Sequence, residues 1–286
     1  QVKMFGPDAV IALGGGSTMD GAKAMAYFSG METKLIAIPT TSGSGSEVTD
    51  FAILTHEGVK HPLVDEKIKP DVAILDSDLV ATLPPVLIAD GGFDLISHAM
   101  EAYVAANHST ISDLLAAEAF RAAMDGLQSS FHGDLDCRAS LHTAATMAGI
   151  AFSQAGLGLC HAISHSLGGE FHIPHGVLNA ILLPLVVEFN ATAALGSYAA
   201  LARQAGLSTG PDAMALRALK SGLVRLRRSL DLPENLAKAG AKPADVRKKM
   251  ESLVAAALAD PCCRTNPVRA DEAAVRRIIT EALGHG

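Results

Sequence analysis

The sequence predicts a small α/β part over residues 1–84, followed by an all-helical domain over residues 85–286. Three short apolar runs, separated by a helical pattern or by turn residues, are typical of buried parallel strands. These runs are 8–13, 34–38 and 71–75. After Leu83-Pro84-Pro85 the strand signals fade, and helical periodicity continues to the end of the chain. The predicted fold class is therefore α/β plus all-α.

The α/β part also contains a predicted helix and a predicted hairpin. A helical pattern follows the first apolar run, from Ser17 to about Phe28. The segments Phe51–Thr55 and Lys60–Val64, with His56-Glu57-Gly58 between them, are predicted to form a hairpin. A doubly wound nucleotide-binding fold needs more parallel strands than the three found here. We therefore expect the α/β part to be incomplete at its N-terminus.

Helix-breaking residues divide the second part into several helices. The predicted breaks lie near Asn107, Gly133, Gly156–Gly158, Pro174, Gly206–Pro211, Pro233, Pro243 and Pro261–Pro267. The apolar stretch near residues 176–189 is too short and too interrupted to predict a membrane span.

Composition narrows the class of protein. The net charge is −7 with both signs mixed along the chain, aromatic residues make up 4%, and Trp is absent. Without a basic stripe or a stacking platform, nucleic acid is not an expected partner. The four cysteines form no C-x-x-C pair, and adjacent Cys262 and Cys263 are poorly placed to bridge to each other. We therefore expect a reducing compartment, the cytoplasm.

A glycine loop follows the first predicted strand. Gly14-Gly15-Gly16-Ser17 ends the strand and opens the helix, and Ser17 with Asp20 fits a capping arrangement. Glycines let the backbone approach a phosphate, and a helix N-terminus offers it free N–H donors. The pattern is not G-x-G-x-x-G. A phosphate site and a plain tight turn are about equally supported by this loop alone.

A second loop of small residues follows the next strand. Residues 40–46 are all Gly, Ser or Thr, and they suit a phosphate or the hydroxyls of a ribose. Taken alone, a flexible surface loop is the better interpretation. Two such loops at consecutive strand ends favour a ligand site, because ligands of open α/β sheets bind there.

Two later segments concentrate candidate metal ligands. Asp94 and His98 are four residues apart, which places them on one face of a helix. The other segment carries His161, His165, His172 and His175. A single histidine is usually a core or surface residue, but several buried together with an aspartate are costly unless they share a cation. Imidazole and carboxylate suit Fe²⁺, Zn²⁺ or Mn²⁺, and the ligand types do not choose among them.

These candidates outnumber the three or four protein ligands that a catalytic metal keeps. His165 lies one turn beyond His161, and we predict that it relays protons or contacts the substrate. His172 is predicted to be a neighbour of the site or a surface residue.

Several strings resemble the iron-containing alcohol dehydrogenases. They are GGGSTMDGAK, IPTTSGSGSEVT, DVAILDSDL, FDLISHAMEAY and AGIAFSQAGLGLCHAISHSLGGEFHIPHGVLNAILLP. The resemblance runs from about residue 8 to residue 190, and the last string is highly specific. Within the family, the chain is most similar to the propanol and ethanol dehydrogenases of propanediol and ethanolamine utilisation.

The resemblance implies a Rossmann-like nucleotide-binding part and a helical metal-binding domain, the two-domain architecture of dehydroquinate synthase. It implies metal-assisted hydride transfer between a primary alcohol or aldehyde and a nicotinamide cofactor. The metal ligands fall on Asp94, His98, His161 and His175, and the active-site histidine falls on His165. The cofactor-binding positions fall on Gly15, Gly16, Ser17, Thr40, Thr41, Ser44, Thr49 and Lys60. The implied cofactors are Fe²⁺, with Zn²⁺ as the alternative, and NAD, with NADP as the alternative.

Other functions remain open at the level of sequence. One aspartate and three histidines could hold Zn²⁺ to activate water, as in a hydrolase or a dehydroquinate-synthase-like lyase. As a third possibility, the chain is a truncated and catalytically impaired relative of such enzymes. The two small-residue loops favour the dehydrogenase. By analogy with the family we expect a homodimer or higher homo-oligomer, associated with a microcompartment, without a membrane or nucleic-acid partner.

Overall fold

The computed structural model describes residues 2–30, 32–56 and 59–284 of the chain. A parallel sheet is formed by β1 (Ala9–Gly14), β2 (Lys34–Pro39) and β5 (Val72–Ala73), in the order β1-β2-β5. The short helix α1 (Val2–Phe5) precedes the sheet, and α2 (Gly16–Ser29) connects β1 with β2. These elements confirm the strands predicted at 8–13 and 34–38 and the helix predicted from Ser17. The run at 71–75 forms a strand of only two residues.

The strands are less buried than their sequences predict. Helix α2 packs on one face of the sheet, where Val10 and Ala12 of β1 join Met19 of α2 in a small core. On the other face Ile11 is 63% exposed and Leu13 is 55% exposed. The prediction that the apolar runs form buried strands is therefore wrong for one face of β1, since within the described residues only the other face of this strand is covered by a helix.

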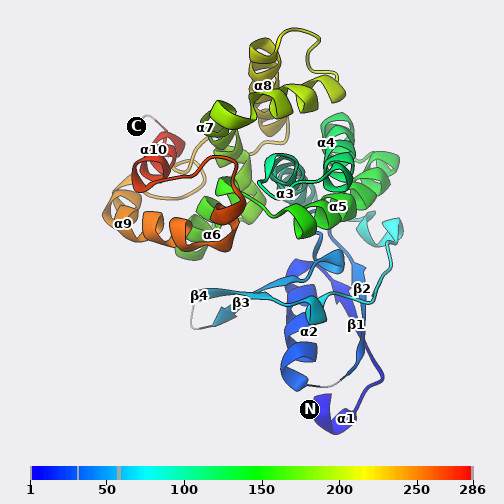
Figure 1. Ribbon diagram of the computed structural model, residues 1–286. Coiled ribbons are helices and arrows are strands. Elements are labelled where there is room, and N and C mark those ends of the chain that lie inside the picture. Colours follow the sequence, from blue (N-terminus) through cyan, green and yellow to red (C-terminus); the bar gives the residue numbers. More distant parts are fainter. Residues whose placement is uncertain (1, 31, 57–58, 285–286) are drawn as a thin grey trace.

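The predicted hairpin is confirmed. Strands β3 (Phe51–His56) and β4 (Val59–Val64) pair antiparallel, and the predicted turn residues Glu57 and Gly58 lie outside the described residues. β3 contacts α2, and β4 contacts α6 of the helical part. The hairpin therefore connects α2 with α6 of the helical part (Figure 1).

The helical part begins immediately after Pro84. Its helices are α3 (Pro85–Val104), α4 (Thr110–Phe131), α5 (Leu135–Ala155), α6 (Leu159–Phe171), α7 (His175–Gln204), α8 (Asp212–Ser229), α9 (Pro243–Ala259) and α10 (Glu272–Ala282). The 3-10 segments are η1 (Ser46–Val48), η2 (Glu66–Ile68), η3 (Ser77–Val80) and η4 (Pro261–Thr265). Every predicted break falls at a helix end or between helices.

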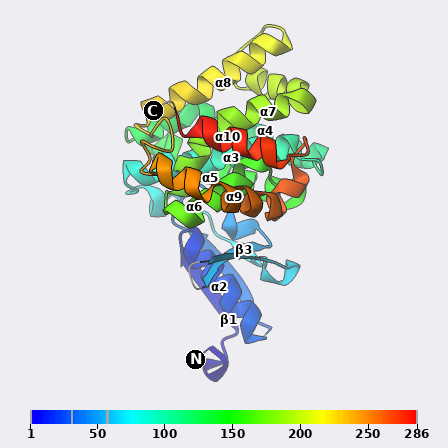
Figure 2. The ribbon, with the colours of Figure 1, turned by 90° about the vertical axis from the view of Figure 1, so that its left-hand side faces the viewer.

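Local capping explains several of these ends. Ser109 and Ser112 form a capping box at the start of α4, while Asp134 and Asp271 accept backbone N–H bonds at the starts of α5 and α10. The helices enclose one large hydrophobic core, and Figures 1 and 2 show this part stacked on the α/β part from two directions.

Helix α7 is longer than its apolar stretch predicts. It has the length and the mean hydropathy of a membrane-crossing helix, but 67% of its most apolar window is buried inside this protein. That burial is what a central core helix shows. All four cysteines, Cys137, Cys160, Cys262 and Cys263, are free.

Candidate active site

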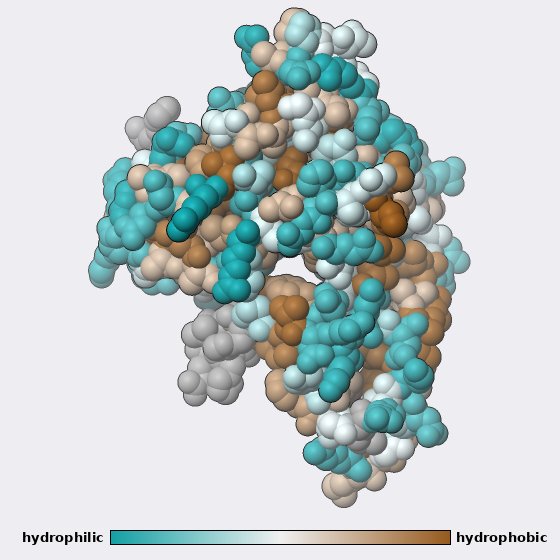
Figure 3. Space-filling model, in the orientation of Figure 1, coloured by the Kyte–Doolittle hydropathy of each residue, from teal (hydrophilic) through white to brown (hydrophobic). Residues whose placement is uncertain are grey.

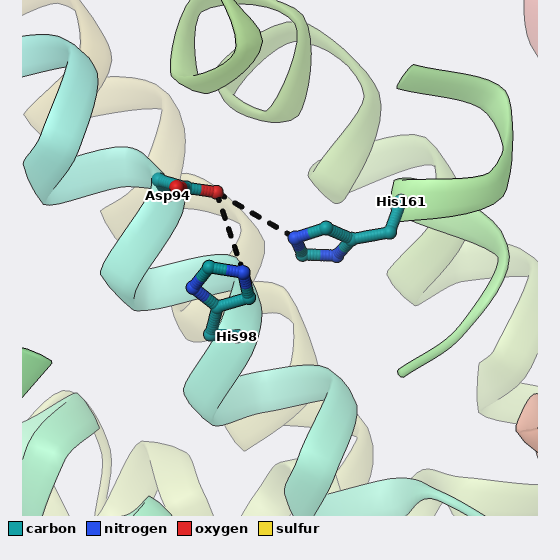
Figure 4. A group of neighbouring side chains, drawn as sticks. All are labelled: Asp94, His98 and His161. Atoms are coloured by element: carbon teal, nitrogen blue, oxygen red, sulfur yellow. Dashed lines mark ion pairs between the residues drawn. The ribbon is translucent and has the colours of Figure 1, made fainter. Parts of the chain in front are cut away.

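Three histidine rings surround one carboxylate oxygen. Asp94 Oδ1 lies 3.6 Å from Nε2 of His98, 3.6 Å from Nε2 of His161 and 3.6 Å from Nε2 of His175. Asp94 and His98 are one turn apart on α3, His161 lies on α6, and His175 is the first residue of α7. The structure therefore brings the four candidate ligands together from three helices. Figure 4 shows the carboxylate of Asp94 facing the rings of His98 and His161.

Hydrogen bonds fix two of these rings. His98 Nδ1 lies 3.1 Å from the carbonyl oxygen of Gly43, and His161 Nδ1 lies 2.6 Å from Glu101 Oε2. A carbonyl oxygen only accepts, so Nδ1 of His98 carries the proton and donates it. Its Nε2 then keeps a lone pair toward the cluster. Asn179 orients the carboxylate by donating to Asp94 Oδ1 at 3.0 Å.

Burial and charge set the protonation of the cluster. Burial lowers the pKa of His98 to about 4 and holds the pKa of His175 well below its usual range. Burial acts to raise the pKa of Asp94, but the neighbouring histidines hold it well below its usual range. Burial also acts to lower the pKa of His161, but Asp94 and Glu101 raise it to about 9. The cluster thus combines an ionised carboxylate with the neutral imidazoles of His98 and His175, whereas His161 must release its proton before it can bind a cation.

His165 lies next to the cluster. Its ring stacks on His175 with centroids 5.1 Å apart, and its Nδ1 lies 2.9 Å from Asp260 Oδ2. His172 ends α6 in a left-handed conformation and is exposed, so the prediction that it is a surface residue is confirmed.

The glycine loop (residues 14–17) and the second loop of small residues (residues 40–46), here called the serine-rich loop, meet at the ends of β1 and β2. A Cβ on Gly15 would lie 3.3 Å from Thr41, and a Cβ on Gly16 would lie 3.1 Å from Ser44. The backbone N–H of Thr40 donates to the carbonyl oxygen of Gly14 at 2.9 Å. The two loops therefore pack side by side.

A cavity of about 270 Å³ joins these loops to the histidine cluster. Of the predicted residues, Gly16, Ser17, Ser44, Thr49, Asp94, His98, His161, His165 and His175 line it. Gly15, Thr40 and Thr41 do not line it, and the side chain of Lys60 falls outside the described residues. The space-filling view shows an opening between the helical part and the α/β part (Figure 3).

The serine-rich loop also packs against α3, a contact that its sequence does not predict. A Cβ on Gly43 would lie 2.7 Å from the Cα of Gly91 on α3. Because both residues are glycine, the loop approaches α3 closely enough for the Gly43 carbonyl oxygen to accept from His98. The loop is therefore packed against α3, in contrast to the flexible surface loop that its sequence alone favours.

Sequence reasoning missed several residues of this site. Asp20, Ser46, Phe51, Ile53, Phe152 and Leu157 also line the cavity, and Phe152 stacks on His98 at 4.4 Å. Glu101 could have been predicted from the sequence, because it is seven residues after Asp94 and so lies on the same helix face. Asp260 could not have been predicted, since it lies 95 residues from His165 in the chain.

Comparison with known proteins places the chain among alcohol dehydrogenases. Residues 1–77 match the model of the iron-containing alcohol dehydrogenases, and residues 88–283 match that of the C-terminal part of the Fe-containing alcohol dehydrogenase family. The 1-propanol dehydrogenase PduQ of Salmonella typhimurium is 41% identical, covering 99% of this chain and 80% of the relative. The NADPH-dependent butanol dehydrogenase of Clostridium saccharobutylicum is 37% identical, covering 97% and 77%.

The fold agrees with these relatives. The solved iron-containing alcohol dehydrogenase from Thermococcus thioreducens superposes with a TM-score of 0.92 at 36% identity, covering 99% of this chain and 80% of that one. A hydrolase, a lyase or an impaired relative is not favoured by these matches. The chain is an oxidoreductase of alcohols and aldehydes, and it belongs to the iron-containing alcohol dehydrogenase family.

Proposed function

We propose that Asp94, His98, His161 and His175 hold Fe²⁺ and that the enzyme interconverts a short primary alcohol and its aldehyde with NAD. The supporting observation is the single oxygen Asp94 Oδ1 at 3.6 Å from three imidazole Nε2 atoms. The family uses Fe²⁺ and a nicotinamide cofactor. We propose NAD rather than NADP as the cofactor and Fe²⁺ rather than Zn²⁺ as the metal.

The residues fit a divalent cation. His161 is 1% exposed, and its Nε2 is a buried nitrogen without a hydrogen-bond partner among the described residues. Leaving such a nitrogen unpaired costs about 1–3 kcal/mol. A cation between the rings would remove that cost and satisfy the carboxylate. One carboxylate and three imidazoles suit Fe²⁺ or Zn²⁺ and leave room for a substrate oxygen.

The remaining chemistry divides between the bound groups and the chain. When bound, the metal lowers the pKa of an alcohol hydroxyl, and the nicotinamide takes up hydride. His165 is proposed to hold the proton that leaves the alcohol, since it stands at the cluster and lines the same cavity. The rings of Phe51 and Phe152 and the side chain of Leu157 give the cavity an apolar wall, which suits a short alkyl chain.

The two loops are proposed to bind the cofactor. Gly15, Gly16 and Ser17 open α2 with free backbone N–H groups, which suit a pyrophosphate. Thr40, Thr41, Ser44, Thr49 and Lys60 are proposed to line the rest of the cofactor site. We also propose a domain boundary between residues 84 and 85, a homo-oligomer and an association with a microcompartment.

Metal content tests the ligand assignment. His161→Ala and His175→Ala are each expected to lose the iron that elemental analysis finds in the wild-type protein. His172→Ala is the matched control, because His172 is exposed and is expected to leave the iron content unchanged. Iron retained in both ligand variants would contradict the assignment.

Cofactor reduction tests the activity. Iron-loaded protein mixed with a short primary alcohol is expected to form reduced cofactor from NAD, followed by its absorbance, with a parallel reaction containing NADP. Reduction of NADP alone would correct the cofactor. The absence of reduction with either cofactor, together with absence of aldehyde reduction in the reverse assay, would contradict the proposed function.

A further inference from the structure

We propose that Glu101 is a positioning residue, which holds the ring of His161 in the orientation and tautomer that a metal ligand needs. This inference rests on the proposed function, because it takes His161 as a ligand. Glu101 lies on α3, one turn beyond His98, and it is 2% exposed.

Four donors converge on the carboxylate of Glu101. Oε2 lies 2.6 Å from His161 Nδ1, and it accepts the backbone N–H of Gly158 at 3.0 Å and that of His161 at 3.3 Å. Oε1 accepts the backbone N–H of Cys160 at 2.7 Å. One side chain of α3 thus holds both the backbone and the ring of the same ligand on α6.

The start of α6 explains why these backbone donors are available. The residue that precedes the helix is Gly158, which has no side chain to cap it. The first N–H groups of a helix need external acceptors, and the helix dipole favours negative charge at that end. Glu101 supplies these acceptors together with Asn266, whose Oδ1 accepts the N–H of Leu159 at 3.0 Å. His161 lies in this first turn, so capping the helix also places the ligand.

The contact with Nδ1 decides the tautomer of His161. The oxygen Oε2 acts as an acceptor toward two backbone N–H groups, and it accepts the Nδ1–H bond in the same way. The proton of a neutral ring therefore lies on Nδ1, and the lone pair lies on Nε2. That Nε2 is the buried nitrogen 3.6 Å from Asp94 Oδ1 that lacks a hydrogen-bond partner in the described structure. A carboxylate behind a histidine ligand fixes its orientation and makes it a stronger donor to metal.

If Glu101 had only a structural role, the expected effect of its loss on metal binding would be different. If Glu101 only caps α6, its loss and the loss of Asn266 should affect metal binding alike, since both side chains cap the same turn. If Glu101 also positions His161, its loss should weaken metal binding more than the loss of Asn266. Within the described residues Asn266 makes no hydrogen bond to the ring of His161 and pairs instead with Asn190.

Metal affinity separates the two roles without an activity assay. The probe is Co²⁺, titrated into metal-free protein and followed by its visible absorption. Glu101→Gln keeps the size of the side chain but places an NH₂ donor against one of the existing donors. We expect this variant to bind Co²⁺ about 10–100-fold more weakly than the wild type. Asn266→Ala is expected to lower the melting temperature while it keeps the Co²⁺ affinity within about threefold of the wild type.

A second variant moves the carboxylate without changing it. A Cβ on Gly158 would lie 2.7 Å from Glu101 Oε1 and 2.8 Å from Asn266 Oδ1, so Gly158→Ala must displace these side chains. Its backbone is extended and accepts alanine without strain. We expect weaker Co²⁺ binding in this variant as well. It decides the matter if Glu101→Gln does not fold.

The wild-type protein offers an independent readout. In Zn²⁺-loaded protein with ¹⁵N-labelled histidine, the His161 ring is expected to show the Nδ1–H tautomer. An Nε2–H tautomer would overturn the inference.

Each binding outcome has one meaning. Wild-type Co²⁺ affinity in both Glu101→Gln and Gly158→Ala, with affinity lost in His161→Ala, would overturn the role of Glu101 and leave the proposed function standing. Equal losses in Glu101→Gln and Asn266→Ala would reduce Glu101 to a helix cap and would also overturn it. Wild-type affinity in His161→Ala would instead remove the proposed metal site.

Discussion

Gly176 and Asp90 bring α7 and α3 into direct backbone contact: a Cβ on Gly176 would lie only 1.8 Å from the carbonyl oxygen of Asp90. The side chain of Asp90 strengthens the contact, because its Oδ1 accepts the N–H of Val177 at 3.0 Å. His175 precedes this glycine and begins α7. The position of His175 against the cluster therefore depends on a residue without a side chain.

Gly176→Ala is expected to push the start of α7 away from α3 and to displace His175. We expect a loss of about 1–3 kcal/mol in the free energy of unfolding, the usual cost of an added carbon in a packed core, together with reduced metal content. Denaturant unfolding and elemental analysis measure the two effects. Gly169→Ala on α6 is the matched control, because nothing described lies within 4 Å of its Cβ. Equal behaviour of the two variants would contradict the steric argument.

The buried ammonium of Lys23 ties α2 to the loop before β3. Its Nζ donates to Ser46 Oγ at 3.0 Å, to Thr49 Oγ1 at 3.0 Å and to the carbonyl oxygen of Phe51 at 2.8 Å. Ser46 and Thr49 line the site cavity, so Lys23 supports it from behind. Burial lowers the pKa of Lys23 to about 8, against the attraction of Asp20 and Glu47.

Lys23→Met is expected to change how stability depends on pH. Between about pH 8 and the usual lysine pKa, the unfolded chain holds the proton of Lys23 while the folded chain has released it, so this group makes stability rise with pH in that window. Relative to Lys23→Met, the wild type should gain about 2 kcal/mol between about pH 7 and pH 9.5. Denaturant unfolding of both proteins at the two pH values measures this gain. A constant difference between the two proteins would show that burial does not shift the pKa.

Local pattern predicted most of the secondary structure and the candidate metal ligands, while the resemblance to the family chose four ligands among those candidates. The i, i+4 spacing of Asp94 and His98 places both on one face of a helix whatever the helix packs against. The glycine loop and the serine-rich loop follow strands that are neighbours in the sheet, so their proximity is also implied by chain order. These features depend on periodicity and on short connections, which a sequence displays directly.

The features that could not be predicted from the sequence depend on contacts between segments that are distant in the chain. The exposure of Ile11 depends on which elements cover the sheet, and an apolar run gives no sign of it. The serine-rich loop owes its course to the contact of Gly43 with Gly91, two residues that are far apart in the chain. The partner of His165 is likewise distant, at Asp260.

Removal of the metal is expected to destabilise the protein, because a ligand that binds only the folded state adds its binding free energy to folding. Chelation should lower the melting temperature of the wild type, and added Co²⁺ should restore it. His161→Ala should melt at one temperature with or without chelator. A chelator-sensitive melting temperature in that variant would point to a metal held elsewhere.

The carboxylate of Asp260 should matter for turnover more than for metal binding. Although burial opposes it, the hydrogen bond from His165 lowers the pKa of Asp260, so an ionised carboxylate faces Nδ1 and leaves Nε2 of His165 to take a proton. Asp260→Asn keeps the shape but weakens this bond, and we expect kcat to fall about 10-fold or more, with an altered pH profile and normal metal content. Asp271→Asn is the matched control, because Asp271 caps α10 just as Asp260 caps η4, but it makes no hydrogen bond to a histidine in the described part of the chain. An equally small loss of activity in both variants would show that Asp260 acts only as a cap. Loss of metal in Asp260→Asn would show that His165 belongs to the ligand set.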